Sequence, residues 1–268
     1  MKAAGKVIVV TGAGSAMGRQ VALELLRRQA RVAAVDLNET TLGETAALAP
    51  GGLQALSTHV VNVTDRAAVE ALPQAVVDRF GAVDGVINCA GIIQPFVPLA
   101  DLDYAVIDRV FEVNRRGTLY MTKSFLPFLL KRPEAHVVNI SSMGGFLPVP
   151  GQTIYGASKA AVKLMTEGLH SELARTSVRV TVVFPGAVET NITANSGVAI
   201  PAIAGRGGKQ RSALPAHKAA QDIVNAMEHD AFRLLVGSDA KMLDRLYRLH
   251  PRRATAFIAN QMGDLLST

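Results

Sequence analysis

Apolar and polar positions alternate between two kinds of segment along most of the chain. Continuous apolar runs rich in β-branched residues, such as "KVIVVTG" at 6–12, predict strands that are buried on both faces. Segments with apolar residues at i,i+4 spacing, such as Val21 and Leu25, predict helices. Further strands are expected at 31–36, 53–60, 83–88, 136–141, 178–184 and 233–237. Helices are expected near 17–29, 40–47, 65–79, 103–114, 118–131, 153–175 and 216–229.

This alternation predicts an α/β fold with a doubly wound parallel sheet of about seven strands and right-handed crossovers. No linker or repeat interrupts the pattern, so we expect one domain over 1–268. The stretch 187–215 departs from it, and a long irregular stretch in a compact domain is typically a lid or a disordered segment. We expect a substrate loop there. We also expect a C-terminal extension near 240–266, with two helices interrupted at Pro251.

Composition excludes several classes of protein. Of the 268 residues 49% are hydrophobic and 19% charged, which is enough for a core and argues against global disorder. Aromatic residues make up only 5% and there is no Trp, so we expect no nucleic-acid partner. Cys89 is the only cysteine and is expected to be a small buried side chain, which excludes an intrachain disulfide. Without a signal-like start or an apolar run of membrane-spanning length, we expect a cytoplasmic location.

The formal net charge is +6, and basic residues gather in two places. They are Arg206, Lys209 and Arg211, and then Lys241, Arg245, Arg248, Arg252 and Arg253. We interpret them as solvated faces that also attract an anionic cofactor. The second group belongs to a basic amphipathic tail, which could lie on a membrane or cover a neighbouring subunit, but we favour packing on the protein itself. The six histidines lack ligand spacing, so no metal is expected.

A glycine-rich turn, "TGAGSAMG" at 11–18, follows the first strand and opens the first helix. Such glycines let the backbone approach a pyrophosphate, and the helix N-terminus favours its charge. The spacing of Gly12, Gly14 and Gly18 differs from the common G-x-G-x-x-G fingerprint, so an ordinary strand–helix turn stays an alternative.

Asp36 strengthens the dinucleotide interpretation, because it ends the second strand 18 residues after Gly18. A carboxylate at this point can bind a ribose 2′-OH and would repel a 2′-phosphate, which predicts NAD rather than NADP. Arg19 is the nearby cation that could reverse this preference.

Six motifs occur in the order typical of one family: "TGAGSAMG" (11–18), "NCAG" (88–91), "VNRRG" (113–117), "NISSMGG" (139–145), "YGASK" (155–159) and "FPGAVET" (184–190). Over residues 5–237 the chain therefore resembles the short-chain dehydrogenase/reductase family. The resemblance implies the sheet order 3-2-1-4-5-6-7 with helices on both faces. It also implies hydride transfer between a nicotinamide and an alcohol or carbonyl.

Two positions depart from the family pattern. Ala16 stands where the family usually has the middle glycine, and its methyl group is expected to tighten the turn or shift the pyrophosphate. Asn62 stands where an aspartate near the adenine is common. Because asparagine both donates and accepts hydrogen bonds, we expect the adenine contact to survive.

The catalytic residues implied by the resemblance are Asn114, Ser142, Tyr155 and Lys159. Tyr155 is the acid/base, and Lys159 lies one helical turn away, where its ammonium should lower the pKa of the phenol. Ser142 is preferred to Ser141 because the family serine lies 13 residues before the tyrosine. It would donate to the substrate oxygen, and Asn114 would hold a water that passes protons from Lys159.

The resemblance also implies the cofactor contacts. They are Gly12, Gly14, Ser15, Ala16, Met17, Gly18, Asp36, Asn62, Val63, Asn88, Ala90, Gly91, Tyr155, Lys159, Pro185, Gly186, Val188 and Thr190. The candidate substrate contacts are mostly apolar, which suggests a lipophilic alcohol or ketone. They are Ile93, Phe96, Met143, Phe146 and Ile192, with Val198, Ile200 and Ile203 in the loop. The alternative that these side chains only pack the lid stays open.

By resemblance the protein should be a homodimer or homotetramer, with helices near 101–131 and 153–175 at the interface. Ala157, Ala161 and Gly168 offer small residues for close helix packing. Two other functions stay open: an NAD-dependent lyase or epimerase, and a non-catalytic NAD-binding sensor. Sensors usually lose the tyrosine or the lysine, and here both are present.

Overall fold

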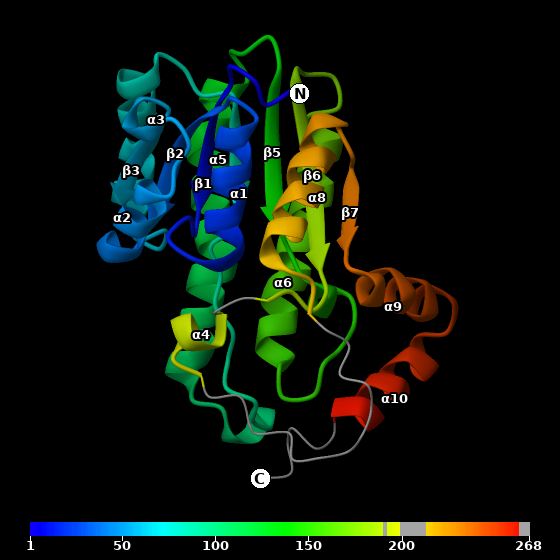
Figure 1. Cartoon of the computed structure of the whole chain (residues 1–268). Coiled ribbons are helices and arrows are strands. Elements are labelled where there is room, and N and C mark those ends of the chain that lie inside the picture. The colour runs from blue at the N-terminus through cyan, green and yellow to red at the C-terminus, as the bar shows by residue number, and fades with distance from the viewer. Residues whose placement is uncertain (190–191, 199–212, 263–268) are drawn as a thin grey trace.

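A seven-stranded parallel sheet forms the centre of the computed structural model, which describes residues 1–189, 192–198 and 213–262. All arrowheads point to the same edge of the sheet, at the bottom of Figure 1. The strand order is β3-β2-β1-β4-β5-β6-β7, so the predicted fold class and order are confirmed. The strands are β1 (Val7–Thr11), β2 (Arg31–Asp36), β3 (Leu56–Val60), β4 (Gly85–Asn88), β5 (Ala135–Ile140), β6 (Val178–Pro185) and β7 (Arg233–Val236).

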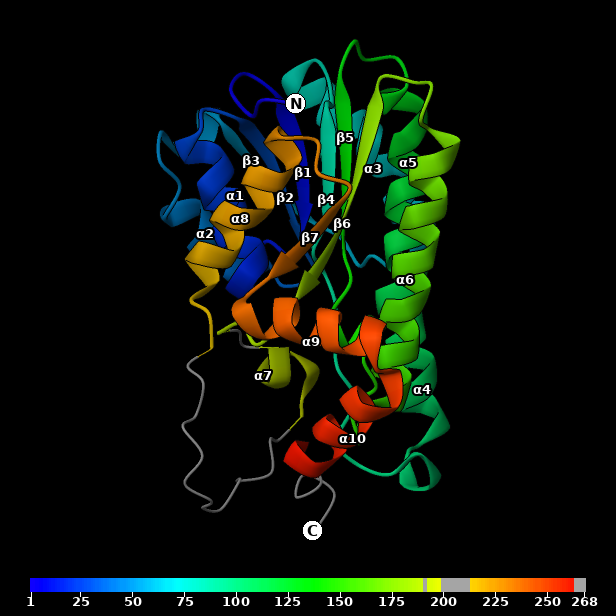
Figure 2. The ribbon, with the colours of Figure 1, turned by 90° about the vertical axis from the view of Figure 1, so that its right-hand side faces the viewer.

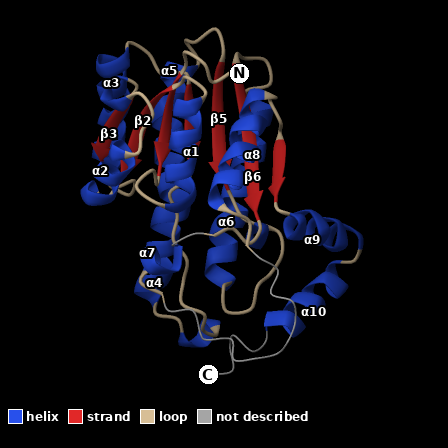
Figure 3. Ribbon diagram, in the orientation of Figure 1, coloured by secondary structure: helices blue, strands red, loops and turns tan. Residues whose placement is uncertain are grey.

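Helices cover both faces of the sheet (Figures 1 and 3). One face is covered by α1 (Ala16–Arg27), α2 (Glu39–Ala47) and α8 (Ala216–Glu228). The other is covered by α3 (Arg66–Phe80), α5 (Thr118–Leu129) and α6 (Thr153–Glu172). The remaining α-helices are α4 (Tyr104–Phe111), α7 (Ile192–Ser196), α9 (Ser238–Leu249) and α10 (Pro251–Met262).

The apolar core consists of two layers because alternate residues of each strand face opposite sides of the sheet. In β1, Ile8 and Val10 belong to the layer under α1 and α8, while Val7 and Val9 belong to the layer under α3 and α5. All four are fully buried. This two-sided burial explains why the strands read as continuous apolar runs rather than alternating ones.

Polar residues meet at the carboxyl edge of the sheet. Thr11 of β1 pairs with Asn88 of β4, which pairs in turn with Asn139 of β5. The amide of Asn88 donates to Asn139 Oδ1 at 2.8 Å. In open α/β sheets ligands bind outside this edge, so the register places the candidate site here.

The C-terminal helices lie at the same edge, where Figure 2 shows α9 running across the foot of the sheet. Leu243, Ala254 and Ile258 pack against Leu147, forming a third apolar cluster separate from the two layers. Two helices on either side of the break at Pro251 are as predicted, and part of their apolar surface packs on the protein, while Leu249 and Phe257 stay exposed. No helix among the described residues is long and apolar enough to cross a bilayer.

Some local features differ from the prediction. A π-helix, Glu112–Gly117, joins α4 to α5, and a 3₁₀ turn, Gly52–Gln54, occupies the expected start of the third strand. Two more 3₁₀ turns, Leu99–Asp101 and Met143–Gly145, lie in loops. The short helix α7 forms within the stretch expected to be irregular. With three to six residues, these elements are too short to show the repeated i, i+3, i+4, i+7 pattern by which a helix is recognised.

Candidate active site

The glycine-rich turn lies at the amino end of α1, and its glycines leave the backbone there without side chains. Gly12 has φ +69°, and a Cβ there would lie 3.0 Å from the Cα of Ala90. A Cβ on Gly18 would lie 2.1 Å from the carbonyl oxygen of Gly12. Side chains at either position would therefore separate the turn from β4 or from α1. The result is a close-packed loop at a helix N-terminus, a geometry that binds phosphate groups.

Ala16 has φ +46°, which lies in the left-handed region. Glycine adopts this conformation readily, whereas an L-residue with a Cβ is strained there by roughly 1 kcal/mol. The departure from the family pattern thus leaves the glycine-type backbone in place and adds strain at the first residue of α1.

Neighbouring residues of the turn are tied to other segments. The hydroxyl of Ser15 accepts from Asn195 Nδ2 of α7 at 2.7 Å. Met17 packs on the layer under α1 and α8. The helix α7 therefore contacts the glycine-rich turn directly.

Asp36 is held in place by two backbone N–H groups. Its Oδ2 accepts from Gly14 at 2.9 Å and its Oδ1 accepts from Asn38 at 3.1 Å. The carboxylate therefore stands beside the glycine-rich turn at the end of β2. The structure brings these two predicted features together although 22 residues separate Gly14 from Asp36.

Arg19 is engaged with the protein. Its Nε donates to the carbonyl of Gly14 at 3.1 Å, and its Nη2 donates to the carbonyl of Thr41 at 3.2 Å. Nη2 also pairs with Glu44 Oε2 at 2.6 Å. The charge of the guanidinium is thus balanced within the α1–α2 contact.

The predicted adenine residues lie after β3. Asn62 is exposed, and its side-chain oxygen accepts from both the N–H and the hydroxyl of Thr64. Val63 packs beside Gly117, where a Cβ would approach Val63 Cγ2 to 2.7 Å. The backbone around Val63 therefore lies close to the π-helix, which contains Gly117.

Tyr155 and Ser142 meet at the carboxyl edge. Tyr155 lies in the first turn of α6, and Ser142 follows β5. The Ser142 hydroxyl lies beside the Tyr155 ring, since a Cβ on Gly144 would be 3.5 Å from both Ser142 Oγ and Tyr155 Cε1, and it accepts from Gly144 N at 3.0 Å. Ser141, in contrast, is buried and donates to the carbonyl of Lys159 at 2.7 Å. Ser141 thus bonds within the protein whereas Ser142 lies against Tyr155, and the choice of Ser142 as donor to the substrate stays a prediction.

Burial determines the acidity of both predicted proton-transfer groups. It raises the pKa of Tyr155, and the hydrogen bond with Ser142 opposes that effect only partly. It lowers the pKa of Lys159 to about 8. The lysine Nζ donates to the carbonyl of Ile140 at 3.0 Å. In the protein alone, the expectation of a lowered tyrosine pKa is therefore wrong, because loss of solvent outweighs any effect of the ammonium.

Asn114 lies beside Lys159 but uses its amide on the protein. Its Oδ1 accepts from Ile92 N at 2.8 Å, and its Nδ2 donates to Ile92 O and to Ser158 Oγ, both at 2.9 Å. A Cβ on Gly91 would lie 3.1 Å from Lys159 Nζ and 3.2 Å from Asn114 Oδ1. Asn114 therefore fixes the loop after β4 against α6, and its role toward a water stays a prediction.

Backbone hydrogen bonds also hold the start of that loop. The Thr11 hydroxyl accepts from Cys89 N at 3.0 Å and from Ala90 N at 3.1 Å. Next to them Asn88 is buried, and its Oδ1 has no partner among the described residues. The contact between β1 and β4 thus continues beyond the sheet into the loop.

The segment after β6 is fixed by the C-terminal region. Gly186 donates to the carbonyl of Val236 at 2.9 Å, and Ala187 donates to Asp239 Oδ2 at 2.7 Å. Val188 forms a bridge with Leu214, while Pro185 ends β6. Thr190 lies outside the described residues.

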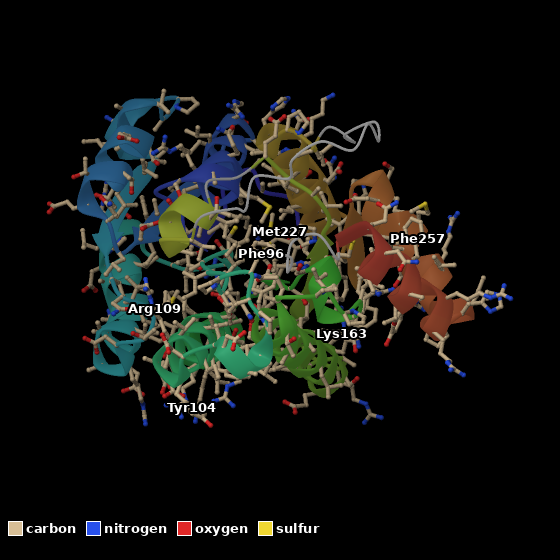
Figure 4. The ribbon with its side chains drawn as sticks, turned by 90° about the horizontal axis from the view of Figure 1, so that it is seen from below. Phe96, Tyr104, Arg109, Lys163, Met227 and Phe257 are labelled. Atoms are coloured by element: carbon tan, nitrogen blue, oxygen red, sulfur yellow. The ribbon has the colours of Figure 1, made fainter. Side chains whose placement is uncertain are left out.

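The candidate substrate residues divide into two groups. Ile93 is buried with its N–H donating to Ser196 of α7, and half-buried Phe96 lies near the middle of the view in Figure 4. Ile192 begins α7. Phe146 instead packs edge-on against Phe184, with ring centroids 5.5 Å apart.

Met143 shares with Phe146 the apolar cluster under α9 and α10. These two residues therefore contact the C-terminal helices, and their role toward a substrate stays a prediction. Val198 is described, whereas Ile200 and Ile203 lie outside the described residues.

Two polar residues that sequence reasoning did not single out lie within this region. Gln94 is fully buried and bonds the first turn of α6, and Asp239 bonds the segment after β6. A polar residue inside the apolar run "GIIQPF" was the only signal for Gln94. Within the described ranges, His, Cys, Asp and Glu side chains form no group of three that could hold a metal ion.

Comparisons with known proteins agree with this geometry. The family model for short chain dehydrogenases matches residues 6–199. A Mycobacterium tuberculosis protein named as an oxidoreductase, SadH, is 38% identical over 261 residues, covering 91% of each chain.

Solved structures are similar as well. A short-chain dehydrogenase/reductase from Burkholderia phymatum in complex with NAD has a TM-score of 0.80 and 27% identity, covering 93% of this chain and 96% of that one. A short-chain dehydrogenase from Burkholderia cenocepacia in complex with NADP has a TM-score of 0.80 and 25% identity, covering 96% and 99%.

Proposed function

Because this chain belongs to the short-chain dehydrogenase/reductase family, we propose that it interconverts a secondary alcohol and a ketone with NAD(H), using Tyr155 as the acid/base. The observation that carries the proposal is the pairing of Ser142 with Tyr155, one helical turn from the buried Lys159. We further infer that the whole chain acts as one catalytic domain.

The described residues fit a dinucleotide cofactor, because the glycine-rich turn and Asp36 form a close-packed cradle at a helix N-terminus. The turn from Gly12 to Gly18 would hold the pyrophosphate, and Asn62 and Val63 would border the adenine. The nicotinamide end would contact Asn88, Ala90, Gly91, Lys159, Pro185, Gly186, Val188 and Thr190. When bound, the nicotinamide supplies or accepts the hydride.

The NAD preference rests on Asp36 and Arg19. The carboxylate of Asp36 is oriented by Gly14 and Asn38, so it can accept hydrogen bonds from a ribose and would repel a 2′-phosphate. The guanidinium of Arg19 is paired with Glu44. The similar solved structures contain either dinucleotide, so affinities for NADH and NADPH must be compared directly.

Ser142, Tyr155 and Lys159 have different roles in binding the substrate oxygen and in transferring its proton. Ser142 donates a hydrogen bond to the substrate oxygen. Tyr155, whose raised pKa keeps it protonated near neutrality, donates its proton to that oxygen during reduction. In the reverse direction the phenol must first ionise, and the ammonium of Lys159 stabilises the phenolate.

The substrate class follows from Ile93, Phe96 and Ile192, which are the apolar candidates in the loop after β4 and in α7. We infer a lipophilic secondary alcohol or ketone. A panel of small polyols and bulky apolar alcohols, monitored by NADH absorbance in both directions, tests this inference. Turnover of only the polyols would contradict it.

Replacement Tyr155→Phe tests the mechanism. We expect kcat to fall about 10²–10⁴-fold, because the acid/base group is removed. NADH affinity should stay within about twofold, because a phenyl ring keeps the packing of the site. The matched control is Tyr104→Phe, since Tyr104 is 85% exposed on α4. Persistent turnover in Tyr155→Phe would refute the assignment, and NADH binding without turnover in the unmodified protein would favour a sensor.

A homo-oligomer is also part of the proposal. Exposed apolar side chains lie on the helices expected at the interface, namely Leu119 of α5 and Leu164 of α6. The cytoplasmic location, the lack of a nucleic-acid partner and the preference for packing over membrane contact stay predictions of the sequence.

A further inference from the structure

We propose that Gln94 is a positioning residue that fixes the first turn of α6, and with it the phenol of Tyr155. This inference rests on the proposed function, because it concerns the geometry of the proposed acid/base. Gln94 belongs to the loop after β4 and is separated from Tyr155 by 61 residues of sequence.

The amino end of α6 needs an acceptor from elsewhere in the chain. The first N–H groups of a helix have no partners within it and are usually capped by the residue before the helix. Here that residue is Gln152, whose side chain makes no capping bond. Instead Gln94 Oε1 accepts from Ile154 N at 2.8 Å and from Tyr155 N at 2.9 Å.

Gln94 is itself held firmly. Its side chain is fully buried, and its Nε2 donates to the carbonyl of Gly151 at 2.9 Å. Gln152 adds a bond from the other segment, because its Nε2 donates to the carbonyl of Gln94 at 2.8 Å. We call Gln94 and Gln152, with these bonds, the glutamine clasp. It joins the loop after β4 to the chain entering α6.

The rest of this loop is anchored on both sides of the active site. Asn114 binds both backbone groups of Ile92, and the hydroxyl of Ser196 accepts from Ile93 N at 3.0 Å. Gln94 therefore extends from a fixed backbone. The first turn of α6 requires such a fixed acceptor to hold one orientation.

Tyr155 and Lys159 depend on the glutamine clasp to different degrees. The N–H of Tyr155 bonds Gln94 directly, whereas Lys159 is anchored one turn later by the carbonyl of Ile140 and by Ser141. Loosening the first turn should thus displace the phenol from Ser142 while leaving Lys159 in place. A displacement of about 1 Å in a reacting group can lower a rate on the order of 10²-fold.

The test compares three variants of the full chain. Gln94→Met preserves the volume but removes the acceptor, Gln94→Glu preserves an acceptor oxygen, and Gln74→Ala removes an exposed glutamine bond to Asp78 on α3. Three quantities are measured for each: amide hydrogen exchange over 150–158, the Kd for NADH, and kcat with the best substrate of the panel.

For Gln94→Met we expect amide exchange at Ile154 and Tyr155 to accelerate at least about tenfold, because both N–H groups lose their acceptor. kcat should fall on the order of 10²-fold, while the Kd for NADH should change less than about twofold. Gln94→Glu should restore amide protection and most of kcat. Gln74→Ala should match the unmodified protein in all three measurements.

Unchanged amide exchange in Gln94→Met would overturn the proposal, and so would a loss of NADH affinity equal to the loss of kcat. If Gln94→Met does not fold, amide exchange in the unmodified protein decides: the N–H groups of Ile154 and Tyr155 should be as well protected as those in the middle of α6, because Gln94 caps them. Exchange at these two positions at the rate of an uncapped helix end overturns the proposal. If the unmodified protein shows no turnover, the proposed function is refuted but the inference about Gln94 is not. Amide exchange still measures whether Gln94 caps the first turn of α6.

Discussion

Ala16 and Lys159 both cost the folded protein free energy. Ala16 takes a left-handed backbone conformation, and Lys159 places an ammonium group where only 3% of the residue is exposed. Strain and buried charge are commonly found at functional sites, where the surrounding structure enforces them. Both residues therefore allow stability measurements to test the site without a known substrate.

Replacement Ala16→Gly should stabilise the protein by up to about 1 kcal/mol, because relief of the left-handed strain exceeds the entropy gained by the unfolded chain. Urea unfolding provides the measurement. Ala71→Gly, in the exposed middle of α3, is the matched control and should destabilise by about 1 kcal/mol. Equal losses in both variants would show that Ala16 is unstrained.

Lys159 should make stability depend on pH. Burial lowers its pKa from 10.5 to about 8, so between these values the unfolded chain binds more protons and stability rises with pH. Below pH 8 both states carry the charge and this dependence vanishes. From pH 8 to 10.5, the free energy of unfolding of the unmodified protein should rise by roughly 3 kcal/mol at most relative to that of Lys159→Met. A constant difference in unfolding free energy between pH 8 and 10.5 would contradict the lowered pKa.

Single elements differ in how far the sequence predicts them. The second strand was predicted at 31–36, where β2 lies, because its apolar run is bounded by charged residues. The helix α7 was not predicted, since its five residues span little more than one turn and show no repeating pattern. The π-helix around Asn114 was not predicted either, because hydrogen bonds define it rather than side-chain pattern. The roles of Gln94 and Asp239 depend on contacts between distant segments, which no local pattern records.

The helix α9 should influence cofactor binding through Asp239. Replacement Asp239→Ala removes the acceptor for Ala187 N and should weaken NADH binding about tenfold, because the segment that we propose to contact the nicotinamide loses a charge-assisted bond. Asp239→Asn keeps an oxygen acceptor and should lose about threefold or less. Fluorescence titration with NADH gives both values. Equal Kd values for Asp239→Ala and the unmodified protein would contradict this role.

For the whole molecule, the order of the seven strands followed from the family motifs, whereas the surfaces between subunits did not. The order depends on turns that the sequence displays, such as the glycine-rich turn and the segment with Tyr155. A contact surface between subunits, in contrast, depends on which apolar side chains stay exposed after folding. Leu164 is 69% exposed on α6, a fact that helical spacing alone could not give.

Replacement Leu164→Glu should shift the protein toward monomers, because a charge in a helix–helix interface is desolvated without a partner. Native mass spectrometry over a range of concentrations measures the shift. Leu53→Glu is the control, since Leu53 is 64% exposed in the 3₁₀ turn before β3. Identical assembly of both variants would place the interface elsewhere.

The packing of α9 and α10 on Phe146 and Leu147 has a consequence for synthesis of the protein. These helices leave the ribosome about ninety residues after the segment they cover, which is several seconds at ordinary elongation rates. During that interval the apolar segment next to Ser142 lacks its cover. The nascent chain can therefore pair its first six strands early, whereas β7 and the cover over this segment are added together at the end of synthesis.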